Sequence, residues 1–265
     1  MVSDIDAANA SSTYSKERPD DVRDILGVNV SVLTSDRAVS KIRNVIEKAE
    51  SAHIAFLNAH GANLAYHDKK YRQILENFTV LSDGVGVDLG SAMLYGDKFP
   101  QNLNGTDFVP CLFRQIERPL TVGLLGATPG TADAAAQQFA ELYPRHEFVV
   151  FGHGYFDAGE ETEILKSLRA KRPDVLLVAF GNPTQEFWIA KHCDANVTSV
   201  AIGVGALFDF VAGRVRRAPH WMIRARLEWV YRLWLEPKRL WRRYLLGNPS
   251  FVMSVLKQKF FGKQV

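Results

Sequence analysis

The chain of 265 residues lacks several features, and each absence argues against a class of protein. Only two cysteines are present, Cys111 and Cys193, and they stand eighty-two positions apart with no CxxC spacing. This argues against a disulfide framework or a cysteine-based zinc site, and favours two reduced thiols in a cytoplasmic protein. No stretch approaches the roughly twenty apolar residues that span a bilayer, so no transmembrane helix is expected. Residues 1–22 are polar, and we expect a disordered segment there rather than a signal peptide or an anchor.

Motifs that bind dinucleotides or metals are also missing. The glycines of segment 123–130 have neither the GxGxxG nor the P-loop spacing, which argues against a dehydrogenase or a kinase. The only Asp-x-Asp lies at residues 4–6, so the acidic pair with which many sugar-nucleotide transferases hold a divalent ion is absent from the body. His53, His60 and His67 are seven residues apart, but strand and loop intervene, so no shared metal site is expected. The sequence therefore predicts no metal and no cofactor, and arginines would have to neutralise any leaving diphosphate.

Positive charge and tryptophan are concentrated at the C-terminal end. Residues 214–265 hold thirteen Lys and Arg against two acids, together with four of the five tryptophans. The preceding 213 residues carry nineteen bases and twenty-seven acids. Basic side chains beside amphipathic rings suit a phosphate-bearing partner, either an anionic membrane surface or a nucleic acid. A nucleic-acid-binding protein and a non-catalytic scaffold that docks on membranes therefore stand as alternatives to an enzyme.

Short β-rich runs alternate with helical periods along the body of the chain. The expected strands are Ile25–Leu33 (a strand or short hairpin), His53–Leu57, Phe78–Ser82, Leu120–Leu125, Phe148–Phe151, Val175–Phe180 and Val200–Val204. The expected helices are one capped by Ser35, one over about 63–77, and Thr131–Leu142, Glu160–Ala170 and Thr184–Lys191. This alternation predicts an α/β fold: a Rossmann-like, mostly parallel sheet with helices on both faces. We place this α/β domain at 23–213 and a basic, Trp-rich helical appendage at 214–265.

Polar and small residues follow the strands of this predicted sheet. Ligands of such sheets bind outside the carboxyl ends of the strands, where Asn58, Asp83, Gly126 and Asn182 stand. Asp83 is a candidate general base, although an Asp-Gly pair is also a common turn. Amides around Gly126 can face a phosphate, and a tight turn is the alternative. Tyr155 can stack on a base or simply pack.

Arginines of the appendage recur at helical spacing. Arg232, Arg239 and either Arg242 or Arg243 are separated by seven and by three or four residues, which would align them on one face of a helix. Pro237 interrupts this run and indicates a kink or the start of a new helix. The functional interpretation is a phosphate-binding face, and the alternative is a solvated basic face.

Five segments together resemble the bacterial WecG/TagA/CpsF glycosyltransferases. They are Leu57-Asn58-Ala59, Ser82-Asp83-Gly84-Val85-Gly86, Gly105-Thr106-Asp107, the run Gly181-Asn182-Pro183-Thr184-Gln185-Glu186-Phe187-Trp188, and the stretch 203–244. The resemblance implies that residues 23–213 form the catalytic domain of an inverting, metal-independent transferase. Such an enzyme moves an N-acetylmannosamine-type or glucose-type sugar from a UDP-sugar to a polyprenyl-diphosphate-linked saccharide, in cell-surface or exopolysaccharide biosynthesis. It implies a cytoplasmic protein peripheral on the anionic inner membrane, no nucleic-acid partner, and a possible homo-oligomer.

The resemblance also implies roles for individual residues of the body. Asp83 matches the position of the proposed catalytic base. Gln185 matches a position at the sugar-nucleotide site. Tyr155 and Asp209 match positions expected near the uridine.

In the appendage, Arg232, Arg239 and Arg242 match arginines that are thought to clamp the diphosphate. Two positions depart from the family pattern. Many members have Arg where this chain has Asn102, and relatives often show Thr where it has Phe56. Both fall near the expected sugar pocket, so Asn102 joins the candidate substrate-binding residues and the donor sugar stays open.

Overall fold

The computed structural model describes residues 22–262 of the chain. Residues 1–21 of the segment that we expected to be disordered lie outside the described residues, and Val22 begins the first strand.

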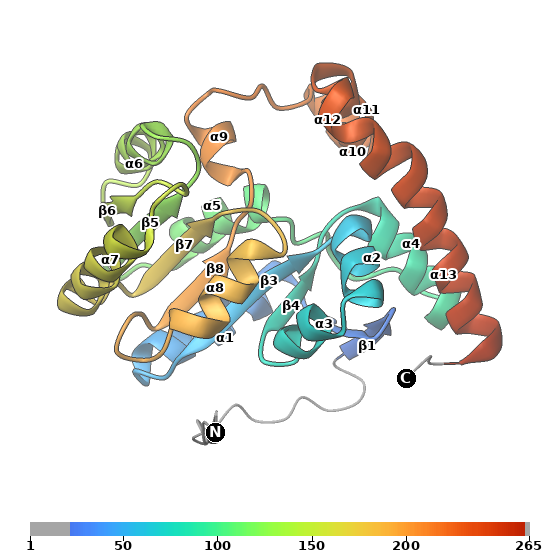
Figure 1. Cartoon of the computed structure of the whole chain (residues 1–265), viewed down its shortest axis with the longest axis horizontal. Helices are drawn as coiled ribbons and strands as arrows, with labels where there is room; N and C mark the ends of the chain where they lie inside the picture. Colours follow the sequence, from blue (N-terminus) through green and yellow to red (C-terminus); the bar gives the residue numbers. More distant parts are fainter. Residues whose placement is uncertain (1–21, 263–265) are drawn as a thin grey trace, which may run out of the picture.

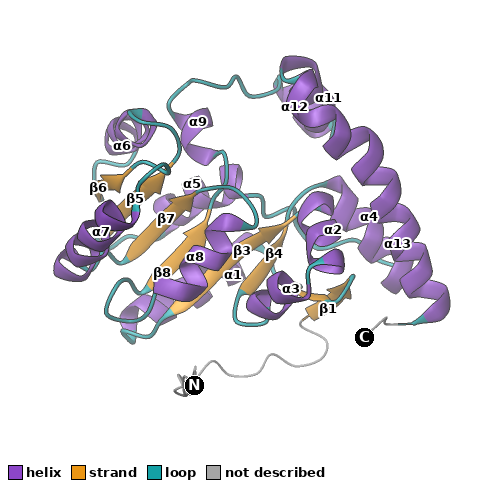
Figure 2. Cartoon of the chain, in the orientation of Figure 1, coloured by secondary structure: helices purple, strands orange, loops and turns teal. Residues whose placement is uncertain are grey.

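Within residues 22–262 one eight-stranded sheet crosses the molecule in the order β1-β2-β4-β3-β8-β7-β5-β6 (Figures 1 and 2). The strands are β1 (Val22–Ile25), β2 (Val28–Ser31), β3 (Ala52–Leu57), β4 (Thr79–Ser82), β5 (Thr121–Gly126), β6 (Glu147–Gly152), β7 (Val175–Ala179) and β8 (Val200–Gly203). Every neighbouring pair is parallel except the β1–β2 hairpin. The predicted Rossmann-like α/β fold is therefore confirmed.

Helices cover both faces because the central strands are apolar on both. All five residues of β7 are buried, and they alternate between two apolar clusters: Leu177 belongs to one, whereas Leu176 and Val178 belong to the other. The helices of the α/β body are α1 (Ser35–Glu47), α2 (Ala59–His67), α3 (Lys69–Leu75), α4 (Val85–Tyr95), α5 (Gly105–Gln115), α6 (Thr131–Leu142), α7 (Ala158–Lys171), α8 (Thr184–His192) and α9 (Leu207–Val211).

Two local predictions were wrong in detail. The helix expected over 63–77 is divided at Asp68, whose side chain accepts hydrogen bonds from the backbone N–H groups of Lys70 and Tyr71 and so caps α3. The cap of α1 is Thr34 rather than Ser35, since the Thr34 hydroxyl accepts the N–H of Arg37 at 3.4 Å.

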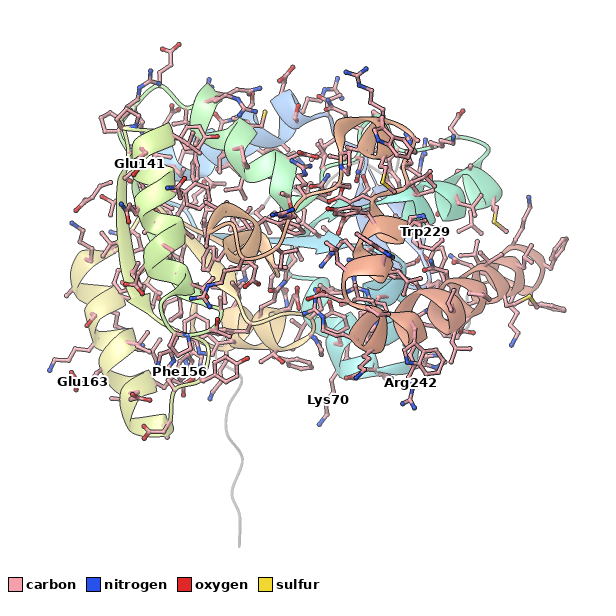
Figure 3. The ribbon with its side chains drawn as sticks, turned by 90° about the horizontal axis from the view of Figure 1, so that it is seen from above. Lys70, Glu141, Phe156, Glu163, Trp229 and Arg242 are labelled. Carbon is pink, nitrogen blue, oxygen red and sulfur yellow. The ribbon has the colours of Figure 1, made fainter. Side chains whose placement is uncertain are left out.

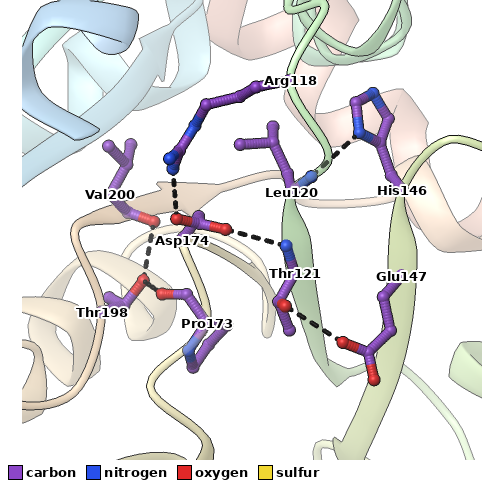
Figure 4. A network of polar contacts seen from close by, with 9 residues as sticks. All are labelled: Arg118, Leu120, Thr121, His146, Glu147, Pro173, Asp174, Thr198 and Val200. Carbon is purple, nitrogen blue, oxygen red and sulfur yellow. Dashed lines mark hydrogen bonds and ion pairs between the residues drawn. The ribbon is translucent and has the colours of Figure 1, made fainter. Parts of the chain in front are cut away.

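A polar network joins the amino-terminal ends of β5 to β8 (Figure 4). Asp174, just before β7, accepts hydrogen bonds from the Arg118 guanidinium at 2.5 Å and from the Thr121 backbone N–H at 2.8 Å. Thr198, just before β8, donates to the carbonyl oxygen of Pro173 at 2.9 Å. These groups are paired with one another and fasten strand starts, so they position the sheet rather than bind a ligand.

The C-terminal part is a succession of short helices followed by one long helix. They are α10 (His220–Arg224), α11 (Glu228–Leu235), α12 (Pro237–Trp241), the π-helical turn η2 (Arg242–Leu246) and α13 (Gly247–Phe261). Pro237 begins α12, as expected for a new helix start. The appendage arginines consequently do not share one continuous helix, because they are distributed over α11, α12 and η2.

Helix α13 packs against α2 and α4 of the body (Figure 1). Its Phe251 and Val255 are fully buried, and Gly90 of α4 leaves space for them: a Cβ on Gly90 would lie 3.0 Å from the Phe251 ring. Gln258 donates to the Asp24 carboxylate at 2.7 Å and accepts the N–H of Leu26 at 2.9 Å. Helix α13 therefore contributes to the core of the body. The division of the chain at residue 213 stays a prediction.

Candidate active site

A cavity of about 1120 Å³ lies at the carboxyl ends of β3, β4, β7 and β8. Its opposite wall is formed by α10, α11, α12, η2 and the start of α13. In the view from above, the segment that carries Trp229 and Arg242 lies beside the strand ends of the body (Figure 3). The appendage therefore completes the cavity. A smaller cavity of about 310 Å³, between the β1–β2 hairpin and the end of α13, is lined by groups such as Asp24 and Gln258 that bind one another.

All the predicted site residues but one line the large cavity. They are Asn58, Asp83, Asn102, Tyr155, Asn182, Gln185, Asp209, Arg232, Arg239 and Arg242. The exception is Gly126, which is buried with a φ of +127°; a Cβ there would lie 2.6 Å from the carbonyl oxygen of Ala179. Gly126 thus permits β5 and β7 to approach closely, and Ala127 and Thr128 face the cavity instead.

Asp83 follows β4 directly and is held at two points. Its backbone N–H donates to the Leu57 carbonyl oxygen at 2.8 Å, and the Asn58 amide donates to its carboxylate at 3.1 Å. Asn58 is itself fixed, because its side-chain oxygen caps α2 by accepting the N–H of Gly61 at 3.1 Å. The two residues therefore present a carboxylate of fixed orientation to the cavity.

Burial raises the pKa of the Asp83 carboxyl, and this effect exceeds the opposing ones. The hydrogen bond from Asn58 lowers the pKa, as do the positive charges of Arg243 and Arg232. The negative charge of Asp107 raises it. A carboxylate with a raised pKa holds a proton better, so it is a better general base than one in water. The Asp83 carboxylate of the body therefore interacts electrostatically with guanidinium groups of the appendage.

The turn after Asp83 is supported by Asn102. Gly84 has a φ of +89°, a conformation that favours glycine, and its N–H donates to the Asn102 side-chain oxygen at 2.7 Å. The Asp-Gly pair is thus both a turn and the end of a strand that presents a cavity carboxylate. Phe56, the other departure from the family pattern, is buried below Gly105, where an added Cβ would lie 3.1 Å from its ring.

Gln185 joins the ends of two strands. Its side chain is 2% exposed, and its oxygen accepts the N–H groups of Gly181 after β7 at 3.2 Å and of Gly205 after β8 at 3.0 Å. Its amide nitrogen donates to Glu186 at 2.8 Å. Protein groups occupy its oxygen, so Gln185 shapes the cavity by holding two glycine turns.

Glu186 lies beneath this pair and was not among the residues singled out from the sequence. It is fully buried, and its Oε1 accepts hydrogen bonds from the side chains of Asn182 at 2.6 Å and Gln185 at 2.8 Å. Its Oε2 has no partner among the described residues. Burial raises the pKa of Glu186 from 4.5 to about 7, against the lowering effect of these hydrogen bonds.

The raised pKa of Glu186 predicts a pH effect on stability. Because the folded pKa exceeds the unfolded one, the contribution of Glu186 to stability is present below pH 4.5 and is lost as the pH rises to about 7. Glu186→Gln keeps an acceptor oxygen but does not titrate. We expect the Tm of this variant, relative to the wild type, to rise by roughly 5 °C between pH 5 and pH 8 in thermal unfolding. If the difference in Tm between the two proteins is the same at pH 5 and pH 8, Glu186 is charged in the folded state at both pH values.

The appendage arginines face the cavity in different ways. The Arg232 guanidinium lies over the Phe210 ring at 5.3 Å, and Arg239 is paired with Glu236. Arg242 is exposed and stacks on the Trp241 ring at 5.3 Å.

Arg243, which the spacing left open beside Arg242, is half-buried and also lines the cavity. Its Nε is buried and has no partner among the described residues, and burial lowers its pKa. Among the positive charges that lower the pKa of Asp83, Arg243 has the largest effect, so it joins the candidate residues.

The appendage arginines also influence the pKa of Asp209. Burial raises its pKa, and Arg214, Arg239 and Arg232 oppose this effect. Two cavity carboxylates, Asp83 after β4 and Asp209 in α9, are therefore both influenced by the appendage arginines.

Three ion pairs or hydrogen bonds fasten the start of the appendage across the cavity. Arg226 donates to the buried carboxylate of Asp88 in α4 at 2.5 Å, and Arg217 donates to Asp107 at the start of α5 at 2.5 Å. Arg214 donates to the Thr128 hydroxyl at 2.9 Å. The sequence reasoning missed these contacts, since they join residues about ninety to one hundred and forty positions apart.

The cavity histidine is neutral at physiological pH. Burial, together with the charge of Arg243, lowers the pKa of His60 to about 4. Over residues 22–262 no three His, Cys, Asp or Glu side chains form a cluster that would hold a metal ion.

Comparison with known proteins adds independent information. Residues 23–265 match the family described as glycosyl transferase WecG/TagA/CpsF. A Bacillus subtilis (strain 168) protein is 32% identical over 220 residues, which cover 82% of this chain and 84% of that protein. A Staphylococcus aureus (strain NCTC 8325) protein is 30% identical over 240 residues, or 89% and 92% of the two chains. Both relatives are named N-acetylglucosaminyldiphosphoundecaprenol N-acetyl-beta-D-mannosaminyltransferase.

Proposed function

This chain belongs to the WecG/TagA/CpsF family of glycosyltransferases, and we propose that it moves N-acetylmannosamine from a UDP-sugar to a polyprenyl-diphosphate-linked saccharide with inversion at the anomeric carbon. The names of the two relatives support this donor sugar and this class of acceptor. The observation that carries the proposal is the juxtaposition of Asp83 with Arg232 and Arg243 in one cavity. A glucose-type donor is the second candidate, because Asn102 and Phe56 depart from the family pattern.

In the proposed mechanism, the oxygen of the acceptor hydroxyl attacks the anomeric carbon of the donor, and Asp83 accepts the proton of that hydroxyl. The bond between that carbon and the β-phosphate oxygen breaks, and UDP leaves with the bonding electrons. One displacement on the opposite face inverts the configuration. Asn58 contributes by holding the Asp83 carboxylate in its orientation.

The developing charge on the β-phosphate is stabilised by guanidinium groups of the appendage. Arg232, Arg239, Arg242 and Arg243 line the cavity. Guanidinium groups bind phosphate oxygens in a bidentate manner and are always charged, so they can replace a divalent cation in this role. We therefore propose that transfer needs no metal.

The outer side of the appendage suits a membrane surface. Its large apolar side chains that are exposed without lining the cavity include Trp221, Trp234, Trp241, Leu245, Leu246, Met253, Phe260 and Phe261. Exposed cations accompany them, among them Arg224, Lys238 and Lys259. Such a surface binds anionic lipids through combined apolar and electrostatic contacts. We propose that the protein lies on the cytoplasmic face of the inner membrane, where the acceptor is anchored.

No helix that the structure describes is long and apolar enough to cross a bilayer. Membership of a glycosyltransferase family replaces the two earlier alternatives, a non-catalytic scaffold and a nucleic-acid-binding protein. The possible homo-oligomer stays a prediction.

Product analysis tests the proposal. Purified protein is incubated with UDP-N-acetylmannosamine or UDP-glucose and a prenyl-diphosphate N-acetylglucosamine acceptor. We expect one N-acetylmannosamine to be transferred, with an anomeric configuration opposite to that of the donor in the NMR spectrum. Transfer of glucose alone would overturn the donor assignment, and retained configuration would overturn the single displacement.

A further inference from the structure

The large cavity has two chemically different walls. Its deep side carries Asn58, Asp83 and the amides of the strand ends, and the appendage adds arginines. The other part of the lining is apolar and comes from four helices, namely α4 of the body and three helices of the appendage. Its residues are Val85 and Leu89 of α4, Ile223 of α10, Trp229 of α11 and Val252 of α13.

Two faces of α4 differ in their surroundings. One face is covered by the body and by α13, since Val87 is fully buried and Gly90 lies under Phe251. The other face carries Val85 and Leu89, which are 40% and 44% exposed although they line the cavity. Trp229 of α11, which also lines the cavity, is 36% exposed. Large apolar side chains thus stand open to solvent inside a cavity that also carries carboxylates and guanidinium groups.

The position of this apolar wall relative to Asp83 is fixed by the helix. Val85 stands two residues after Asp83, and Leu89 lies one turn further along the same face of α4. One turn advances about 5.4 Å along a helix. The apolar stripe therefore begins beside the carboxylate and leads away from it.

The two walls together match only one kind of substrate. A nucleotide sugar has no hydrocarbon chain that could cover Val85, Leu89 and Trp229. A prenyl-diphosphate saccharide has a hydroxyl for Asp83, two phosphates for the arginines and a hydrocarbon chain. The cavity therefore combines charged and apolar groups, and this substrate combines the same two kinds of group.

From this arrangement we propose that Val85, Leu89, Trp229 and Val252 form a subsite for the first isoprene units of the acceptor lipid. The inference rests on the proposed function and adds the place where the hydrocarbon chain binds. Apolar burial contributes to affinity in proportion to the area covered. The subsite consequently makes the enzyme distinguish acceptors by chain length, independently of how the outer side of the appendage meets the membrane.

Steady-state kinetics with two water-dispersed acceptors test the subsite. Both carry the same sugar diphosphate, one on a single isoprene unit and the other on four units. The test variant is the double substitution Val85→Ser and Leu89→Ser. The matched control is Leu142→Ser, an exposed leucine at the end of α6 that does not line the cavity.

We expect the wild type and the Leu142→Ser control to show a lower KM for the four-unit acceptor. The double variant is expected to raise that KM by about tenfold and to raise the one-unit KM much less, because a single unit covers less of the subsite, while liposome binding stays unchanged. An equal change for both acceptors, or none for either, overturns the subsite. Failure of the wild type to use any acceptor contradicts the proposed function instead, so the two failures are distinguishable.

Discussion

Asp83→Asn is expected to lower turnover by about a thousandfold while the affinity for UDP stays nearly unchanged. The amide has nearly the same shape as the carboxyl, but it cannot accept the proton of the acceptor hydroxyl. The remaining side-chain oxygen of the variant can still accept the hydrogen bond that the Asn58 amide donates to Asp83 Oδ2 at 3.1 Å, and the turn at Gly84 is held separately by Asn102. Removal of a negative charge beside Arg243 and Arg232 does not weaken the binding of a diphosphate.

For the wild type and the variant, turnover is measured as the rate of UDP release, and the affinity for UDP is measured by calorimetry. Asp133→Asn serves as the control, because Asp133 is exposed on α6 and does not line the cavity. The control is expected to keep wild-type kinetics. Full turnover by the Asp83 variant would mean that another group takes the proton.

Arg232→Ala is expected to give the second large loss, about a hundredfold or more in kcat. Arg232 influences the carboxyls of both Asp83 and Asp209, so its charge reaches the deep side of the cavity. It is also held over the Phe210 ring at 5.3 Å, which fixes the orientation of the guanidinium. A group that stabilises the departing diphosphate acts mainly in the transition state, so kcat falls more than KM rises.

Two further variants separate charge from geometry. Arg232→Lys keeps the charge but loses the bidentate fork, and an intermediate rate is expected. Arg224→Ala removes an exposed cation of α10 that does not line the cavity, and a wild-type rate with a soluble acceptor is expected. Equal losses for Arg224→Ala and Arg232→Ala would point to the net charge of the appendage rather than to a phosphate contact.

The sequence predicted the central strands well because their apolar runs are continuous, whereas β1 (Val22–Ile25) begins before the expected segment Ile25–Leu33. Val175–Ala179 is buried at every position, and helix Thr131–Leu142 matched its expected bounds. Helices α4 and α5 were not predicted. Gly86 and Gly90 weaken helical propensity in α4, yet close packing requires them: a Cβ on Gly86 would lie 2.8 Å from that of Ala59.

The strand-end rule brought Asn58, Asp83 and Asn182 to one cavity from sequence alone, and their catalytic or binding roles stay predictions. Gly126 itself does not line the cavity, because it serves the close contact between β5 and β7, and a phosphate-binding role for the amides around it stays a prediction. The buried position of Glu186 could not be found from spacing, because its burial depends on how α8 packs on the sheet.

The central claim is that cavity guanidinium groups do the work of a divalent cation beside Asp83. Its most direct measurement is the transfer rate of the wild type and of Arg232→Ala in excess EDTA and again with added Mg²⁺ or Mn²⁺. We predict that the wild-type rate is the same in both conditions and that neither ion restores the variant. A wild-type rate that collapses in EDTA and returns with Mg²⁺ or Mn²⁺ would contradict the account.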